Sequence, residues 1–156
     1  MIVDKLNEFC DATSVVAAQA GTALVGNVID LGATSRDIGN GEPIYAVINV
    51  DTEIITGGNA GTIQFSIASD AQAAIAVDGS ATIHATSPLI VTDDTNANGP
   101  LCKVGAYPLV VALPRGTYER YLGVLCTVGT TATTAGKINA FLTKDPAMFK
   151  AYSDGI

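Results

Sequence analysis

The sequence predicts an all-β fold, a jelly roll or two-sheet antiparallel sandwich of eight or nine strands with little helix, and three observations carry this prediction. Apolar and polar residues alternate over short runs, which is the period of a half-buried strand. Turn-forming stretches such as Gly57-Gly58-Asn59 and Asp78-Gly79 separate the runs. No sustained helical pattern occurs. Many short strands at this spacing are typical of a sandwich or jelly roll.

The expected strands, in chain order, cover residues 14–18, 24–31, 44–50, 62–67, 80–85, 87–92, 108–113, 118–128 and 136–143. The alternation at 62–67 is clearest, with Ile63, Phe65 and Ile67 on one face. In the run at 80–85, Ala81, Ile83 and Ala85 oppose Ser80, Thr82 and His84. The exception to β structure is Asp70–Val77, where an Ala-rich stretch allows a turn or two of helix. The expected core comprises Ile63, Phe65, Ile67, Leu122, Val124, Ile138 and Leu142.

The length of 156 residues predicts one domain over 1–156, with 1–12 a possible N-terminal arm. The net charge is −7 and only 15% of residues are charged, against about 25% in an ordinary domain. No basic patch is available for nucleic acid or an anionic membrane. No apolar run reaches the ~18 residues of a membrane span, and the start MIVDKLNEF lacks signal-peptide features. We therefore expect a soluble intracellular product whose weakly charged surface is partly covered by partners.

Metal sites, cofactors and catalysis find little support in the residue pattern. The cysteines, Cys10, Cys102 and Cys126, are odd in number and widely spaced, so small buried hydrophobes are expected instead of disulfides or zinc ligands. His84 is the single histidine, and any Ser-His-Asp triad would have to be built around it. Its place on the polar face of a strand predicts solvent exposure. We expect no enzymatic activity, no metal and no cofactor.

Two loops resemble ligand-binding motifs in part. Residues 94–99 fit the first half of a calcium loop, but Gly105 stands where the bidentate glutamate is required, so a plain loop is expected. Asp93 and Asp94 are expected to be solvated. The stretch GGNAGT at 57–62 lacks the lysine and the following helix of a phosphate loop, so a hairpin loop is expected there.

The stretch PRGTYERYLGVLCTV at 114–128 gathers arginine and tyrosine at the start of an expected strand. Arginine with aromatic residues is enriched in protein interfaces. The alternative is internal: Arg36 or Arg120 pairs with Asp37, Glu42 or Glu119, and the tyrosines cap the core. The candidate interface residues are Arg36, Asp37, Glu42, Arg115, Tyr118, Arg120 and Tyr121.

Several stretches, taken in order, resemble a family of tailed-bacteriophage capsid cement (decoration) proteins. They are an Asp-Lys pair followed by Phe and Asp near the start, Asn27–Gly32, Arg36–Pro43, the RGTYERYL stretch at 115–122, and Thr134–Ile138. The resemblance spans nearly the whole chain, and its motifs are structural, not catalytic.

The resemblance implies a jelly-roll structural protein of the virion, made in the host cytoplasm and placed on the outer capsid surface. Members of the family clamp neighbouring copies of the major capsid protein as homo-oligomers, so the expected partners are that protein and further copies of this chain, as dimer or trimer. The alternative function is a carbohydrate- or receptor-binding β-sandwich. Such modules usually present aromatic platforms, whereas this chain has no tryptophan.

Overall fold

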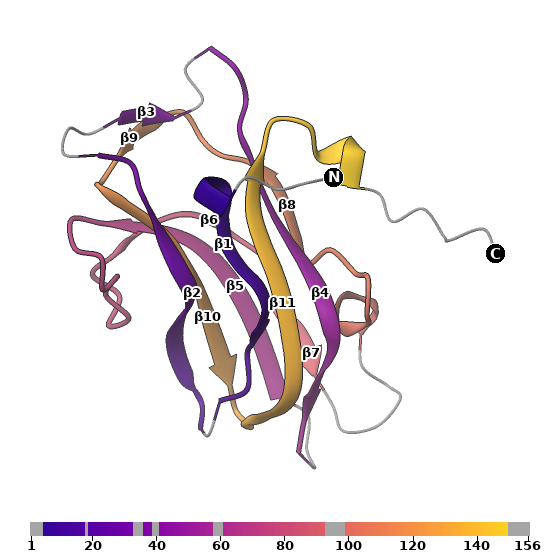
Figure 1. Cartoon of the computed structure of the whole chain (residues 1–156). Coiled ribbons are helices and arrows are strands. Elements are labelled where there is room, and N and C mark those ends of the chain that lie inside the picture. Colours follow the sequence, from indigo (N-terminus) through magenta and orange to yellow (C-terminus); the bar gives the residue numbers. More distant parts are fainter. Residues whose placement is uncertain are drawn as a thin grey trace.

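The computed structural model describes residues 5–17, 19–32, 36–38, 41–57, 61–92 and 99–149. In this part of the chain, strands dominate and the helices are single turns (Figure 1). The 3-10 turns are η1 (Lys5–Asn7), η2 (Pro100–Cys102) and η3 (Pro146–Phe149). None of the described helices is long and apolar enough to span a membrane.

Two antiparallel sheets pack face to face. The four-stranded sheet has the order β1-β11-β4-β8, formed by Glu8–Ser14, Thr133–Thr143, Tyr45–Thr56 and Leu109–Ala112. The five-stranded sheet has the order β2-β10-β5-β6, formed by Gly21–Asp30, Tyr121–Gly129, Gly61–Asp70 and Thr82–Thr86, and β7 (Ile90–Thr92) also pairs with β5. A small third sheet joins β3 (Arg36–Ile38) to β9 (Gly116–Tyr118).

The strand pairing is nested, as in a long hairpin that has been rolled up. β1 pairs with β11, β2 with β10, β4 with β8, and β5 with β6, all antiparallel. The pairs β11–β4 and β10–β5 then join these hairpin segments into the two sheets. This is the jelly-roll arrangement, so the fold class predicted from the sequence is confirmed.

The core lies between the two sheets and contains the residues predicted for it. Six of the seven predicted side chains are fully buried, and Leu142 is partly buried against them. β5 shows why the prediction holds: its alternate residues Ile63, Phe65 and Ile67 all have 0% exposure. Burial of this repeated apolar face is the main term that stabilises the sandwich.

All three cysteines are buried and free, as predicted. Burial raises the pKa of Cys10 and of Cys102 to about 11, and that of Cys126 to about 12. The thiols are therefore protonated at neutral pH and behave as small apolar side chains.

The face assignment of the run at 80–85 is wrong for Ile83. Its side chain is 50% exposed, whereas Ala85 packs against the core. The pairing of β6 with β5 shifts between Ile67 and Ala68, so Ala85 lies opposite Ile67 but Ile83 lies opposite Ala68. The irregularity falls at His84, and it turns the residues on either side of it toward opposite faces of the sheet.

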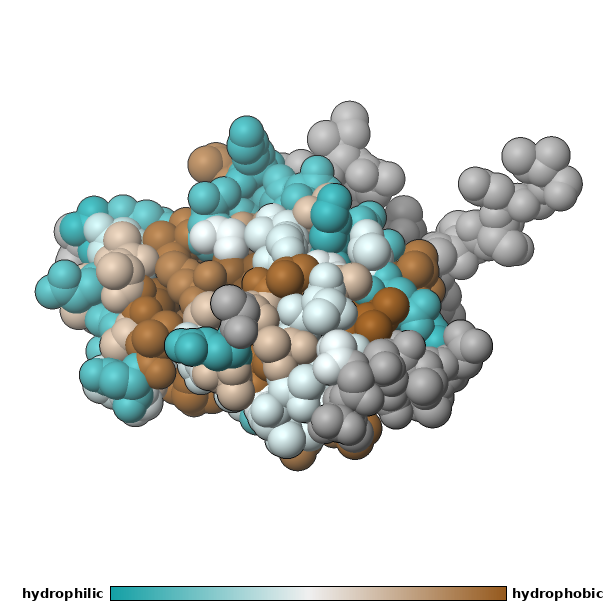
Figure 2. Space-filling model, turned by 90° about the horizontal axis from the view of Figure 1, so that it is seen from below, coloured by the Kyte–Doolittle hydropathy of each residue, from teal (hydrophilic) through white to brown (hydrophobic). Residues whose placement is uncertain are grey.

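The predicted helical turns at Asp70–Val77 are also wrong, because Asp70 draws the backbone into a turn. Its carboxylate accepts hydrogen bonds from the N–H groups of Gln72 and Ala76, at 3.0 and 2.9 Å. These bonds lower the pKa of Asp70. Ile75 then packs onto the outer face of the five-stranded sheet, where Gly123 leaves room for it. Apolar surface gathers on this side of the molecule when it is viewed from below (Figure 2).

Three local expectations have different outcomes. Residues 8–12, assigned to a possible arm, belong to β1 in the four-stranded sheet. The stretch at 57–62 is not a hairpin loop, because it connects β4 in one sheet to β5 in the other. The partial calcium motif lies outside the described residues except for Gly99.

Candidate functional site

The two segments that the sequence marks as interface candidates meet at one end of the jelly roll. β3 and β9 pair antiparallel, with Arg36 opposite Tyr118 and Ile38 opposite Gly116. This end also carries the end of β2 and the starts of β4 and β10 (Figure 1). We call this end of the molecule the charged end. It comprises β3, β9, Asp30, Glu42, Arg115, Arg120 and Lys144.

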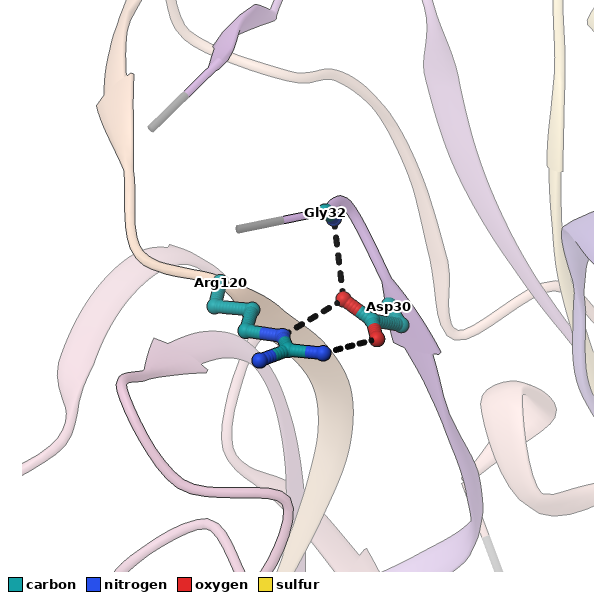
Figure 3. Close-up of polar contacts among 3 residues, drawn as sticks. All are labelled: Asp30, Gly32 and Arg120. Atoms are coloured by element: carbon teal, nitrogen blue, oxygen red, sulfur yellow. Dashed lines mark hydrogen bonds and ion pairs between the residues drawn. The ribbon is translucent and has the colours of Figure 1, made fainter. Parts of the chain in front are cut away.

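Asp30 holds Arg120 in a two-point contact at the charged end (Figure 3). The Nε and Nη2 atoms of Arg120 donate to the two carboxylate oxygens of Asp30, at 3.0 and 2.9 Å. The N–H of Gly32 donates to Asp30 Oδ1 at 2.9 Å. This fork geometry fixes the plane of the guanidinium. Both side chains remain nearly half exposed, so the arginine is oriented and still accessible.

Arg120 has a second contact and a firm backbone anchor. Its guanidinium carbon lies 4.9 Å from the centre of the Tyr121 ring, within range of a cation–π interaction. The N–H of Leu31 donates to the carbonyl of Arg120 at 2.8 Å. The hydrogen bonds and charge of Asp30 raise the pKa of Arg120, so the group stays cationic. The internal alternative named Asp37, Glu42 or Glu119 as the partner of Arg36 or Arg120; the partner of Arg120 in the structure is Asp30.

Glu42 and Arg115 are the other predicted interface residues whose charged side chains the structure describes. Glu42 forms an ion pair with Lys144, and both side chains are about 70% exposed. The hydrogen bond and positive charge of Lys144 lower the pKa of Glu42. Arg115 is exposed and makes no ion pair with any described residue. Arg36 and Asp37 are placed by their backbone pairing in β3.

Tyr118 does not present its side chain to a partner. It is 1% exposed, and its hydroxyl donates to the carbonyl of Pro114 at 2.7 Å. It therefore caps the core, which is the alternative that the sequence left open for the tyrosines. Tyr121 is half-buried and remains at the surface beside Arg120.

His84 is partly buried, so the expectation that it is solvent-exposed is not met. Its ring stacks on Tyr118, and its Nε2 atom lies 2.7 Å from the Oγ of Ser69. Burial lowers the pKa of His84, and the negative charge of Glu119 opposes this in part. The imidazole is therefore mostly neutral at pH 7.

Ser69, His84 and Glu119 do not form a catalytic triad. The carboxylate of Glu119 lies 3.4 Å from Ser69 Oγ, so the serine and not the histidine is its hydrogen-bond partner. A triad requires the acid to orient the histidine. Ser69 is also completely buried, which leaves its hydroxyl out of reach of a substrate. The cluster instead ties β5, β6 and the segment after β9 together.

The sequence missed Asp30, Lys144 and the cluster around Ser69. Asp30 and Arg120 are 90 residues apart, and only the pairing of β2 with β10 brings them together. A signal was present, because Asp30 ends an apolar run and lies in a stretch that carries the family resemblance. Among the described residues, no group of three or more His, Cys, Asp or Glu side chains is arranged to hold a metal ion.

Comparison with known proteins assigns the chain to a family. A search of curated proteins finds no match. The match to a family begins in β1 and ends in β11, so it reaches the first and last strands of the jelly roll and includes β3 and β9 of the charged end. The chain belongs to Bbp16, a phage-related family, whose sequence model matches residues 9–142.

Proposed function

We propose that this protein is a structural component of a phage virion. It binds the outer surface of the icosahedral capsid and clamps neighbouring copies of the major capsid protein, without enzymatic activity. The observation that carries the proposal is the pairing of β3 with β9, which brings two charged segments that are far apart in the sequence together at one end of the sandwich. Membership in a phage-related family supports it.

The charged end suits a contact with another protein. Arg120 is oriented by Asp30 and Arg115 is exposed, so the guanidinium groups can fork onto carboxylates or carbonyl oxygens of a partner. The backbone beneath them is held by the Tyr118–His84 stack and by β3–β9 pairing. A surface that is already ordered loses little conformational entropy on binding.

The clamp acts because it spans a seam between subunits. Separation of two capsid subunits under internal pressure then requires the contacts of the clamp to break first. An interface of standard size buries on the order of 1,200–2,000 Å² in total. A homo-oligomer contacts several capsid subunits at once, and this multivalency strengthens contacts that are modest individually.

Reconstitution of shells that lack the protein tests the proposal. Purified protein should cosediment with such shells and should raise the temperature at which they break open. Arg115→Ala and Arg120→Ala should each weaken binding while leaving the melting temperature of the free protein nearly unchanged. Lys137→Ala is the control, because Lys137 is an exposed cation on β11 and is not part of the charged end.

Two results would overturn the proposal. One is wild-type protein that fails to cosediment with the shells at any concentration tested. The other is binding at the wild-type level by both arginine variants, which would show that the charged end does not contact the shell. Specific binding to a glycan array in place of shells would favour the carbohydrate-binding alternative.

A further inference from the structure

The outer face of the five-stranded sheet contains a shallow pocket of about 470 Å³. Its floor consists of outward-facing side chains from four neighbouring strands, and the pairing of these strands sets the side chains in two rows. Thr22, Thr127 and Gln64 form one row across β2, β10 and β5, and Leu125, Ser66 and Thr86 form the next across β10, β5 and β6. The shape of the floor is therefore fixed by the sheet.

The polar side chains of this floor already have hydrogen-bond partners within the chain. The hydroxyl oxygens of Thr22 and Thr127 lie 2.9 Å apart, in hydrogen-bond contact. The amide of Gln64 donates to a backbone carbonyl at 3.1 Å, and the hydroxyl of Ser66 donates to that of Thr86 at 3.4 Å. Burial of a polar group costs far less when the group keeps a hydrogen bond. An apolar side chain can therefore cover this floor at low cost.

Two aliphatic side chains project beside the pocket. Val77, two residues after the buried Ile75, is 48% exposed, and Ile83 on β6 is 50% exposed. Half-exposed aliphatic side chains gain free energy when a partner removes them from water. One face thus presents both projecting apolar side chains and a pocket that can receive them. Such a face is complementary to the same face on a second copy of the chain.

The charges near the pocket favour another copy of this chain as the occupant. The net charge is −7, so two copies repel unless their contact avoids like charges. Among the residues that line the pocket, Asp78 alone is charged, and its carboxylate accepts two hydrogen bonds from Ser80, at 3.0 and 2.7 Å. The four-stranded sheet, in contrast, carries exposed charges such as Asp51 and Lys137. The five-stranded sheet therefore offers the better face for contact between identical chains.

The pocket lies away from the charged end. β2 and β10 run between the two ends of the sandwich (Figure 1). The charged end holds the end of β2 and the start of β10, whereas the pocket contains Thr22 near the start of β2 and Thr127 near the end of β10. A second copy seated on the pocket therefore leaves Arg115 and Arg120 free to contact the shell.

We propose that this pocket and its aliphatic rim are the surface through which copies of the chain associate face to face. Val77 and Ile83 of one copy pack over the floor of the other, and the same contact is made in return. The inference rests on the proposed function for its role, because a clamp that contacts several capsid subunits needs copies that are joined away from the docking surface.

A single tryptophan tests which face is covered, because the chain has none of its own. Indole emission moves to shorter wavelength when the ring leaves water. Ile83→Trp places this reporter at the rim of the pocket, and its emission should shift to the blue as the concentration of free protein rises through the micromolar range. Val110→Trp is the matched control on β8 of the other sheet, where Val110 is 48% exposed, and its emission should not change.

A matched pair of lysine variants tests the need for an uncharged surface. Thr86→Lys places a cation at the pocket and should weaken self-association at least about tenfold, because the contact would bury an unpaired charge. Thr52→Lys makes the same change at an exposed threonine on β4, outside the pocket, and should associate like the wild type. Sedimentation equilibrium measures both affinities, and the melting temperatures show whether both variants are folded.

The outcomes separate this inference from the proposed function. Free protein that stays monomeric, or equal association of the two lysine variants, overturns the inference, whereas cosedimentation with shells would still support the clamp. A blue shift of Ile83→Trp that appears only when shells are added shows that the capsid protein covers the pocket, and this also overturns the inference. Association through the pocket by protein that does not bind shells supports the surface and overturns the proposed function.

Discussion

The imidazole of His84 lies against the phenol ring of Tyr118, with the ring centres 3.8 Å apart and an angle of 22° between the planes. His84 is in β6, and Tyr118 is the last residue of β9. The stack therefore fixes the base of the charged end to the five-stranded sheet. Two further residues lie beside the imidazole of His84. Ser69 forms a hydrogen bond with it, and the carboxylate of Glu119 is the negative charge that acts on it.

We predict that acidification destabilises the protein through His84. Burial lowers the pKa of His84 below its ordinary value of 6.5, so the unfolded chain takes up this proton first as the pH falls. Above pH 6.5 the residue contributes no pH dependence. Between 6.5 and the lower folded-state pKa, stability falls with pH, and below that range the loss is complete. Melting temperatures at pH 7.5 and 5.5 measure the effect.

His84→Gln is the matched variant, because its amide can reach the position of Nε2 beside Ser69 but does not titrate. The carboxylates contribute equally to both proteins, so the difference between the two pH slopes isolates the histidine. A wild-type slope equal to that of His84→Gln would contradict the prediction.

The sequence predicted the sandwich because strand alternation is a local signal. Ile63, Phe65 and Ile67 alternate with polar residues, and all three are buried as expected. The sequence did not predict the exposure of Ile83, since the irregular pairing at His84 depends on how β6 meets β5. The Asp30–Arg120 contact was missed for the same reason: strand pairing, not spacing along the chain, brings the two residues together.

The charged end could be predicted only in outline. Composition marked the segments 36–42 and 115–121, and the structure joins them through β3 and β9. Tyr118 was wrongly grouped with the accessible residues, because a tyrosine at the start of a strand can face either the core or solvent. Its hydroxyl bonds to Pro114, four residues earlier, and this closes the turn over the buried ring.

Phe65→Ala should reduce the free energy of unfolding by about 3–5 kcal/mol. Phe65 is 0% exposed at the centre of β5, so its removal leaves a cavity that neighbouring strands cannot fill. Urea denaturation of the two proteins measures the loss. Val110→Ala removes an apolar side chain that is 48% exposed and should change stability by less than about 0.5 kcal/mol. Equal effects of the two changes would contradict the assigned core.

Gly26→Ala should destabilise the contact between β1 and β2. The residue has a φ of +72°, and an added Cβ would lie 2.3 Å from the carbonyl oxygen of Phe9. Gly105→Ala is the control, since its φ of +79° gives similar backbone strain and nothing lies within 4 Å of the added atom. Gly26→Ala should cost about 1–3 kcal/mol more than Gly105→Ala in urea denaturation. Equal costs would show that the strands separate easily.

Self-association should involve the outer face of the five-stranded sheet. Val77 and Ile83 are 48% and 50% exposed there, beside a shallow pocket that contains Thr127 and Leu125. Apolar surface of this kind favours association between copies. Sedimentation at micromolar concentration should show a dimer or trimer for the wild type and a monomer for Ile83→Asp. Val110→Asp introduces the same charge at an equally exposed site on β8, and should leave the oligomer intact.

Asp30 should support shell binding by orienting Arg120 more than by stabilising the fold. The pair is exposed and screened by solvent, so Asp30→Asn and Arg120→Lys should each change the melting temperature little. Both changes should weaken shell binding. Asparagine keeps one acceptor but loses the charged fork, and lysine keeps the charge but loses the planar fork that Asp30 holds.

A double-mutant cycle on shell binding distinguishes orientation from independent contacts. If Asp30 acts through Arg120, the double variant should bind about as weakly as Arg120→Lys alone, because the arginine that Asp30 orients is already gone. If each side chain makes its own contact with the shell, the two losses should multiply. Multiplied losses would contradict the positioning role of Asp30 and would place both groups directly in the interface.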